Sequence, residues 1–202
     1  MVLGIDYKHF PVFCQQRNDQ NFPLDSYRQE NNIWDRTWKN FWKNFFDDDR
    51  PYDDARVNKF IRQHGVYMTN SMLCFGGGTK PNKHYPQSIE ICRKYIKEQI
   101  RIVRPRILLS FGTAGCNNAA EILSKYNRNN TVLTELQKNS PLTRLGSLLK
   151  SNPSLQQGIP VNYDSFSFTF WALNQPARNK RYDGDYRVLS NLVKKITEHG
   201  CD

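Results

Sequence analysis

Short apolar runs alternate with longer amphipathic stretches along the chain, and this alternation predicts strands separated by helices. Four apolar runs, each closed by polar or glycine residues, are candidate strands: 1–5, 66–73, 106–111 and 166–173. The clearest helix begins near Pro86 and stops before Pro105, and its apolar side chains recur every three or four positions: Ile89, Cys92, Ile96, Ile100 and Val103. Residues 113–126 and 188–196 are further candidate helices.

Strands that alternate with helices favour a parallel sheet, because parallel neighbours need a crossover connection that packs back onto the sheet. We therefore expect an α/β fold with three layers, α/β/α, around a central, mainly parallel four-stranded sheet. The chain has 202 residues, which predicts a single domain over 1–202. Two parts depart from the alternation: an aromatic helical segment at about 34–61 and an insertion of uncertain shape at about 127–165.

The aromatic segment carries large rings at helical spacing. We interpret them as core packing rather than as a platform for stacking bases. The rings are those of Trp34, Trp38, Phe41, Trp42 and Phe45.

Charge and cysteine content narrow the function classes. The chain carries 29 Lys and Arg against 19 Asp and Glu, a net charge of +10, which suits a polyanionic partner such as nucleic acid but also an ordinary basic surface. An aromatic content of 13% excludes a disordered basic tail. No apolar run is long enough to span a membrane, so we expect a soluble, cytoplasmic protein. Five cysteines without a CxxC pair predict reduced thiols and no metal site.

In a parallel sheet the chemistry is expected at the carboxyl ends of the strands, where polar motifs follow the apolar runs. The first run leads into Gly4-Ile5-Asp6-Tyr7-Lys8-His9, the second contains Thr69-Asn70-Ser71, and the fourth leads into 174–179 (Asn-Gln-Pro-Ala-Arg-Asn). The segment 91–112 combines a helix, Arg104-Pro105, an apolar strand and Gly112. In this order, the four motifs resemble those of the uracil-DNA glycosylase superfamily.

The resemblance implies catalytic roles for three residues. Asp6 would orient or activate water and stabilise positive charge on the sugar, although an Asp after a strand also commonly caps a turn. Asn174 stands where the family usually has a His that donates to O2 of the departing uracil. An amide still offers one such donor. His9 is a possible helper, with a structural role as the alternative.

Substrate-binding roles follow from the same resemblance. The amide of Asn70 can pair with N3-H and O4 of uracil, whereas cytosine reverses both groups; a turn Asn is the alternative. Tyr7 is a candidate for excluding the thymine methyl, since Lys8 occupies the family's usual position, and Gln175 lies beside Asn174. Phe10, Phe13 and Phe22 compete to stack on the flipped base, and we choose Phe13.

Cys74 and Cys92 match two of the four cluster ligands in the iron-sulfur branch of the family. A [4Fe-4S] cluster normally takes four thiolates, and the other two ligands of that branch lie upstream of the first motif. We therefore expect no cofactor, with both cysteines as small buried residues.

DNA phosphates require donors on the loops beside the pocket. Our first choice is the loop carrying Arg178, Asn179, Lys180 and Arg181, followed by Lys80 and Lys83. The cations of the 86–104 helix are interpreted as a solvated face.

These inferences predict a monomeric DNA glycosylase that hydrolyses the N-glycosidic bond of uracil or another deaminated base in single- or double-stranded DNA. An alternative is a catalytically weak or inactive superfamily member that binds DNA or a nucleotide. A third, an unrelated nucleotide-binding domain, is disfavoured because Gly76-Gly77-Gly78 lacks the spacing of a phosphate-binding loop.

Overall fold

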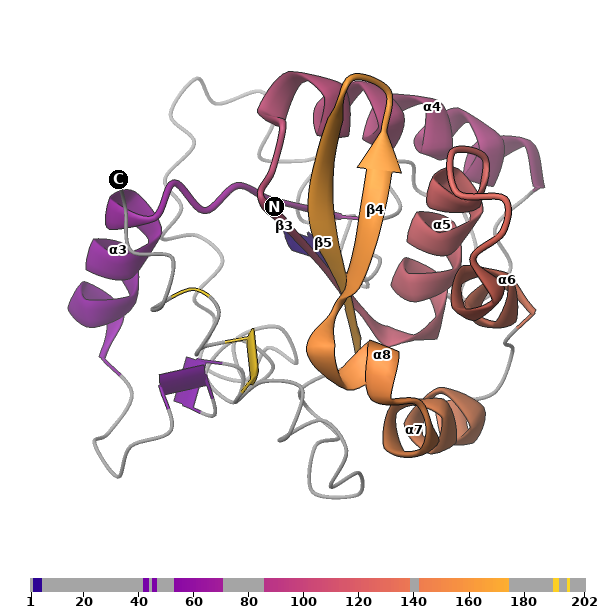
Figure 1. Cartoon of the computed structure of the whole chain (residues 1–202). Helices are drawn as coiled ribbons and strands as arrows, with labels where there is room; N and C mark the ends of the chain where they lie inside the picture. Colours follow the sequence, from indigo (N-terminus) through magenta and orange to yellow (C-terminus); the bar gives the residue numbers. More distant parts are fainter. Residues whose placement is uncertain are drawn as a thin grey trace, which may run out of the picture.

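The computed structural model describes residues 2–4, 42–43, 45–46, 53–70, 86–138, 142–174, 191–192 and 196. Five strands form one sheet in the spatial order β2-β1-β3-β5-β4. They are β1 (Val2–Gly4), β2 (Met68–Asn70), β3 (Ile107–Phe111), β4 (Ile159–Tyr163) and β5 (Phe166–Leu173). Figure 1 shows β3, β5 and β4 in the middle of the molecule, between the helices.

Four of the strands run parallel and fall within the four apolar runs of the sequence. β1 pairs with β2 on one side and with β3 on the other, and β3 pairs with β5. The central strand β3 is buried along most of its length, as a strand covered on both faces requires. The prediction of an α/β fold is confirmed.

The expected count of four strands was wrong, because the sheet has a fifth strand. β4 pairs antiparallel with β5 at the sheet edge and comes from the region interpreted as an insertion of uncertain shape. Ile159, Val161 and Tyr163 are buried, whereas Pro160 and Asn162 between them are exposed. A proline is tolerated here because an edge strand leaves one side of its backbone unpaired. Pro160 weakens the sequence pattern of a strand without preventing one.

The described helices are α3 (Asp54–Gln63), α4 (Pro86–Val103), α5 (Gly112–Ser124), α6 (Thr131–Gln137), α7 (Leu142–Ser151) and α8 (Pro153–Gln157). α4 and α5 match two predicted helices. α6, α7 and α8 belong, with β4, to the 127–165 insertion. Asn130 and Asn152 cap α6 and α8, because each side-chain oxygen accepts from a backbone N–H of the first turn. None of these described helices is long and apolar enough to cross a membrane.

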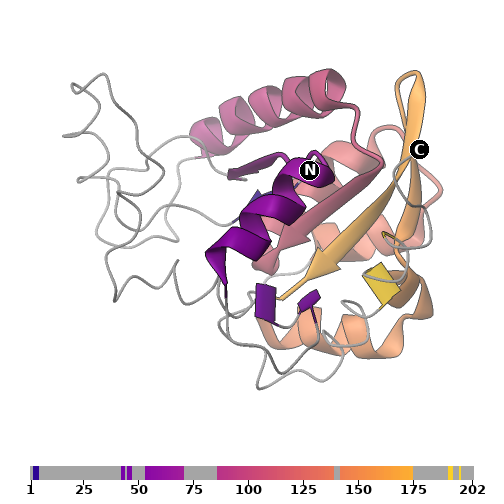
Figure 2. The same cartoon turned by 90° about the vertical axis from the view of Figure 1, so that its left-hand side faces the viewer.

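The strand order places the helices on opposite faces of the sheet. The connection from β1 to β2 moves one way along the sheet, whereas those from β2 to β3 and from β3 to β5 move the other way. Right-handed crossovers therefore put α3 on one face and α4 with α5 on the other. Figure 1 shows α3 to the left of the sheet and α5 and α6 to its right, and Figure 2 shows α3 in front of the sheet. Arg93 on α4 donates from Nε to Asn118 Oδ1 on α5 at 3.2 Å, which joins the two helices on their shared face.

The aromatic segment contributes to the core, as predicted, wherever its side chains are described. Trp42 and Phe45 are buried, and both rings contact Phe60 of α3 at centroid distances of 5.6 and 5.1 Å. Trp34, Trp38 and Phe41 lie outside the described residues. The opposite face is filled by buried side chains of α4 and α5, which include Ile96, Ile100, Cys116, Ile122 and Leu123.

Candidate active site at the carboxyl edge of the sheet

The direction in which the chain moves across the sheet reverses between β1 and β3, which makes this a topological switch point. The connection from β1 to β2 includes α3 on one face of the sheet, and the connection from β3 to β5 includes α5 on the other face. In open α/β sheets, ligands bind at such switch points, outside the carboxyl ends of the strands. In the sequence, Asp6 follows the last residue of β1 by two positions, so its motif starts from a strand at this switch point.

Strand register brings the ends of all four parallel strands to one line. Gly4 of β1 is paired with Asn70 of β2, and Phe111 of β3 is paired with Leu173 of β5. The register of β1 with β3 aligns Leu3 with Ser110, which puts Gly4 level with Phe111. Asn70 and Leu173 are thus three strand spacings apart, or about 14 Å.

Asn174 is the candidate site residue whose side chain is described. It follows the last residue of β5 directly, and only 1% of its surface is exposed. The side-chain oxygen and nitrogen are both buried. A buried amide interacts more strongly with a polar group than one in water, because the surrounding dielectric constant is low. Asn174 therefore places one acceptor and two donors inside the carboxyl edge.

The thiol of Cys116 contacts the end of β5, which leads directly into Asn174. Cys116 on α5 is fully buried, and its Sγ donates toward the backbone carbonyls of Ser110 and Leu173, at 3.5 and 3.7 Å. These carbonyls belong to β3 and β5, so the thiol joins both strands to the first turns of α5. The sequence analysis assigned no role to Cys116. The available signal was its position four residues after Gly112, the glycine that closes the third apolar run of the sequence.

The junction between β3 and α5 contributes more polar groups to this edge. α5 starts at Gly112, directly after β3, with no intervening loop, and Gly112 has φ of 69°, where a side chain would be strained. Within the described residues, Ser110 Oγ and Thr113 Oγ1 are buried without a hydrogen-bond partner. Both hydroxyls were missed by the sequence analysis, which treated this segment as a strand followed by a glycine. Buried hydroxyls of this kind are typical of sites completed by water or a ligand.

Most of the other predicted site residues lie outside the described residues. For Asn70 the structure gives the backbone position, at the end of β2. The remaining predictions stay untested by the geometry: Asp6, Tyr7, His9, Phe13, Lys80, Lys83, Gln175, Arg178, Asn179, Lys180 and Arg181.

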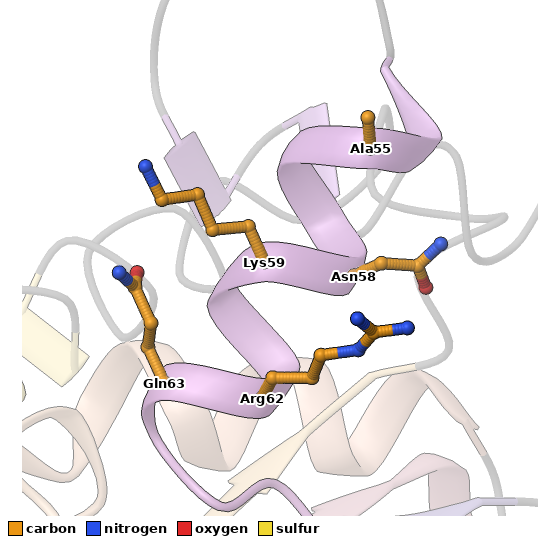
Figure 3. Close-up of a pocket in the computed structure, with 5 residues that line it drawn as sticks. All are labelled: Ala55, Asn58, Lys59, Arg62 and Gln63. Carbon is orange, nitrogen blue, oxygen red and sulfur yellow. The ribbon is translucent and has the colours of Figure 1, made fainter.

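A separate hollow of about 500 Å³ lies on the surface of α3 (Figure 3). Its described lining consists of Ala55, Asn58, Lys59, Arg62 and Gln63, none of which was predicted as a site residue. In Figure 3, Lys59 and Gln63 point to one side of the helix, and Asn58 and Arg62 to the other. The cations are exposed, as is usual on the solvated face of an amphipathic helix. We assign this hollow no role in the site.

The described ranges contain His, Cys, Asp and Glu side chains, which are the usual ligands of metal ions. No group of three or more His, Cys, Asp or Glu side chains there is placed to hold a metal ion. Cys92 is fully buried on α4, as predicted, and Cys74 lies outside the described residues.

A comparison with known protein families shows which family the chain belongs to. The family model of the uracil DNA glycosylase superfamily matches residues 23–183, well over half of the chain. The chain belongs to this superfamily. The relationship expected from the four motifs is thereby confirmed. The comparisons with curated proteins and with solved structures gave no match.

The superfamily match includes only some of the motifs that follow the parallel strands. It includes Asn70, Asn174 and the basic segment up to Arg181, but it begins after the motif that carries Asp6. The structure nevertheless places β1, which leads into that motif, between β2 and β3 in the middle of the parallel strands. The N-terminal segment outside the family match therefore contains β1, one of the two strands at the topological switch point.

Proposed function

We propose that this superfamily member is a DNA glycosylase that hydrolyses the N-glycosidic bond of uracil or another deaminated base in DNA. One observation carries the proposal: the register aligns Gly4, Asn70, Phe111 and Leu173 along one edge. The motifs of Asp6, Asn70 and Asn174 thereby start from the same edge of the sheet. Membership of the superfamily supports the reaction class.

Each step of base excision needs a different chemical group at this edge. The target base must leave the stack and enter a pocket, where water attacks the sugar carbon and the base departs with the electron pair of the glycosidic bond. The Asp6 carboxylate stabilises positive charge that develops on the sugar and orients the water. The amide of Asn70 recognises N3-H and O4 of uracil.

Asn174 acts as a hydrogen-bond donor to the departing base. Its amide N–H donates to O2, where negative charge accumulates as the bond breaks. Burial of the side chain supports this role, since a desolvated donor stabilises an anion more than a hydrated one does. Because the loss of one optimal donor typically lowers turnover by about 10²–10³-fold, we expect slow but measurable catalysis.

The test is base release from oligonucleotides that contain uracil, hypoxanthine or xanthine, in single- and double-stranded form, with alkali added to cleave abasic sites. We expect product from at least one of these substrates. If enzyme in excess over DNA gives none after hours, the glycosylase proposal fails. The alternative, a weak or inactive member that binds DNA or a nucleotide, is favoured by the replacement of the family's usual His by Asn174; it predicts DNA binding without base release.

A further inference from the structure

Helix α4 exposes a line of large apolar side chains on the side that faces away from the core. Its inner side is formed by Cys92, Ile96 and Ile100, all fully buried. On its outer side Ile91 is 47% exposed, Tyr95 58% and Ile102 75%. These three residues are separated by four and seven positions, so they lie along one stripe of the helix.

This concentration is unusual for a solvated surface. Single exposed apolar residues are normal, whereas apolar residues that gather on one surface mark interaction sites. Five large apolar side chains are exposed within the described residues, and three of them form this stripe on α4. The stripe is therefore a candidate contact surface.

The exposed charges beside the stripe favour a protein partner over a polyanion. The exposed charged residues of α4 are Glu90, Lys94, Glu98 and Arg101, two of each sign. Arg101 is already paired with Glu98 at 2.8 Å. A nucleic-acid surface needs an excess of positive charge, which this face lacks. Balanced charges around apolar residues instead suit a protein partner of the same pattern.

When two copies of α4 are placed antiparallel, the apolar and charged residues of one copy lie opposite matching residues of the other. Ile91 and Ile102 are equally far from a midpoint between positions 96 and 97, and Tyr95 and Glu98 are equally far from the same point. In an antiparallel pair centred there, Ile91 lies opposite the partner's Ile102. Lys94 then lies within about one residue, or 1.5 Å along the axis, of the position opposite the partner's Glu98. The two Tyr95 rings are offset by about 4.5 Å along the axis, close enough for ring contact.

We propose that two copies of this chain form a symmetric dimer in which their α4 helices pack antiparallel through Ile91, Tyr95 and Ile102. Such an interface uses the same surface on both copies, as two-fold symmetry requires. It departs from the monomer expected from the sequence. One helix face is smaller than a standard interface, so we expect a weak dimer that forms only as the concentration rises. The stripe lies on the side of α4 opposite the buried Cys92, Ile96 and Ile100, so the dimer forms without disturbing the core.

The test is sedimentation velocity of the full chain, under reducing conditions, across the micromolar range. The wild type should shift from monomer to dimer as its concentration rises. The double substitution Ile91→Glu, Ile102→Glu should weaken association at least about tenfold, because charged groups would be buried opposite each other. Arg128→Glu, an exposed change outside α4, is the control and should leave association unchanged.

A charge exchange tests the antiparallel register itself. Lys94→Glu should weaken the dimer, and adding Glu98→Lys in the same chain should restore part of the loss, since the carboxylate introduced at position 94 then meets the ammonium group introduced at position 98 of the partner. Circular dichroism shows whether each variant keeps its helices. A wild type that remains monomeric throughout, or a dimer insensitive to the Ile91 and Ile102 changes, overturns the proposal. Neither result depends on base release.

Discussion

The thiol of Cys116 lies 3.7 Å from the backbone carbonyl oxygen of Leu173 and donates toward it, so a side chain of α5 holds the last residue of β5. Asn174 follows directly. The same thiol donates toward Ser110 O of β3 at 3.5 Å. The position of the buried amide of Asn174 thus depends on a contact between residues 57 positions apart in the chain.

Removing this thiol should affect the site more than the fold. Cys116→Ala should lower the free energy of unfolding by about 1–2 kcal/mol, through lost packing and a lost weak hydrogen bond, as measured in urea. Cys92→Ala is the matched control, since Cys92 is equally buried but lies on α4. Both variants should lose similar stability, and Cys116→Ala alone should slow base release. Equal activity in the two variants would show that Cys116 does not position Asn174.

Gly158 is required by close packing as well as by its backbone conformation. Its φ is 80°, and a Cβ there would lie 2.5 Å from Thr169 Cγ2 and from Trp171 Cε2. Gly158→Ala should therefore destabilise the fold by about 3 kcal/mol or more in urea unfolding. Gly65→Ala is the control, because Gly65 has φ of 56° with no atom within 4 Å of a Cβ; it should cost only about 1 kcal/mol. Similar losses at the two sites would argue against the steric explanation.

Asp6→Asn should lower turnover on the preferred substrate by at least about 10²-fold while DNA affinity changes little. The physical reason is that a carboxylate beside the sugar interacts most strongly once positive charge has developed in the transition state. Single-turnover kinetics and binding to an uncleaved oligonucleotide measure the two effects separately. A comparable loss of affinity would mean that Asp6 contributes to binding instead.

Asn70→Asp should reduce the preference of the enzyme for uracil over cytosine. A protonated carboxyl group can donate to N3 of cytosine, but it cannot reproduce the full donor and acceptor pattern of the amide. Base release from matched uracil and cytosine oligonucleotides measures the ratio of the two rates. If the ratio of the two release rates does not change, Asn70 does not distinguish uracil from cytosine.

The loop after β5 should carry much of the salt dependence of DNA binding. Replacing Arg178, Lys180 and Arg181 together with Ala should reduce the slope of log affinity against log salt by about two to three units on duplex DNA, if each cation contacts a phosphate. Fluorescence anisotropy over a salt series measures the slope.

The matched control is a triple Ala substitution at the opposite edge of the sheet. Arg106 precedes β3, and Lys125 and Arg128 follow α5, so these exposed cations lie away from the strand ends. They are better controls than cations such as Arg93, which donates to Asn118. Equal slopes for the two triple variants would indicate a diffuse basic surface. They would contradict the proposal that Arg178, Lys180 and Arg181 contact DNA phosphates.

The sequence was most informative where burial follows directly from a local pattern. The parallel strands β3 and β5 are apolar runs because most of their side chains are buried, and α4 shows the spacing of a helix with one buried side. The motifs that indicated the superfamily lie at strand ends. The order and spacing of polar residues after apolar runs were therefore sufficient to indicate both the fold class and the family.

Tertiary structure decided the features that depend on pairing between distant segments. β4 was missed because an edge strand that alternates buried residues with Pro160 and Asn162 has no continuous apolar run. The burial of Asn174 depends on the strands and helix packed around it, and the link from Cys116 to Leu173 depends on α5 folding back against β5. The alignment of Gly4, Asn70, Phe111 and Leu173 likewise arises from hydrogen-bonded register between strands, which no single segment encodes.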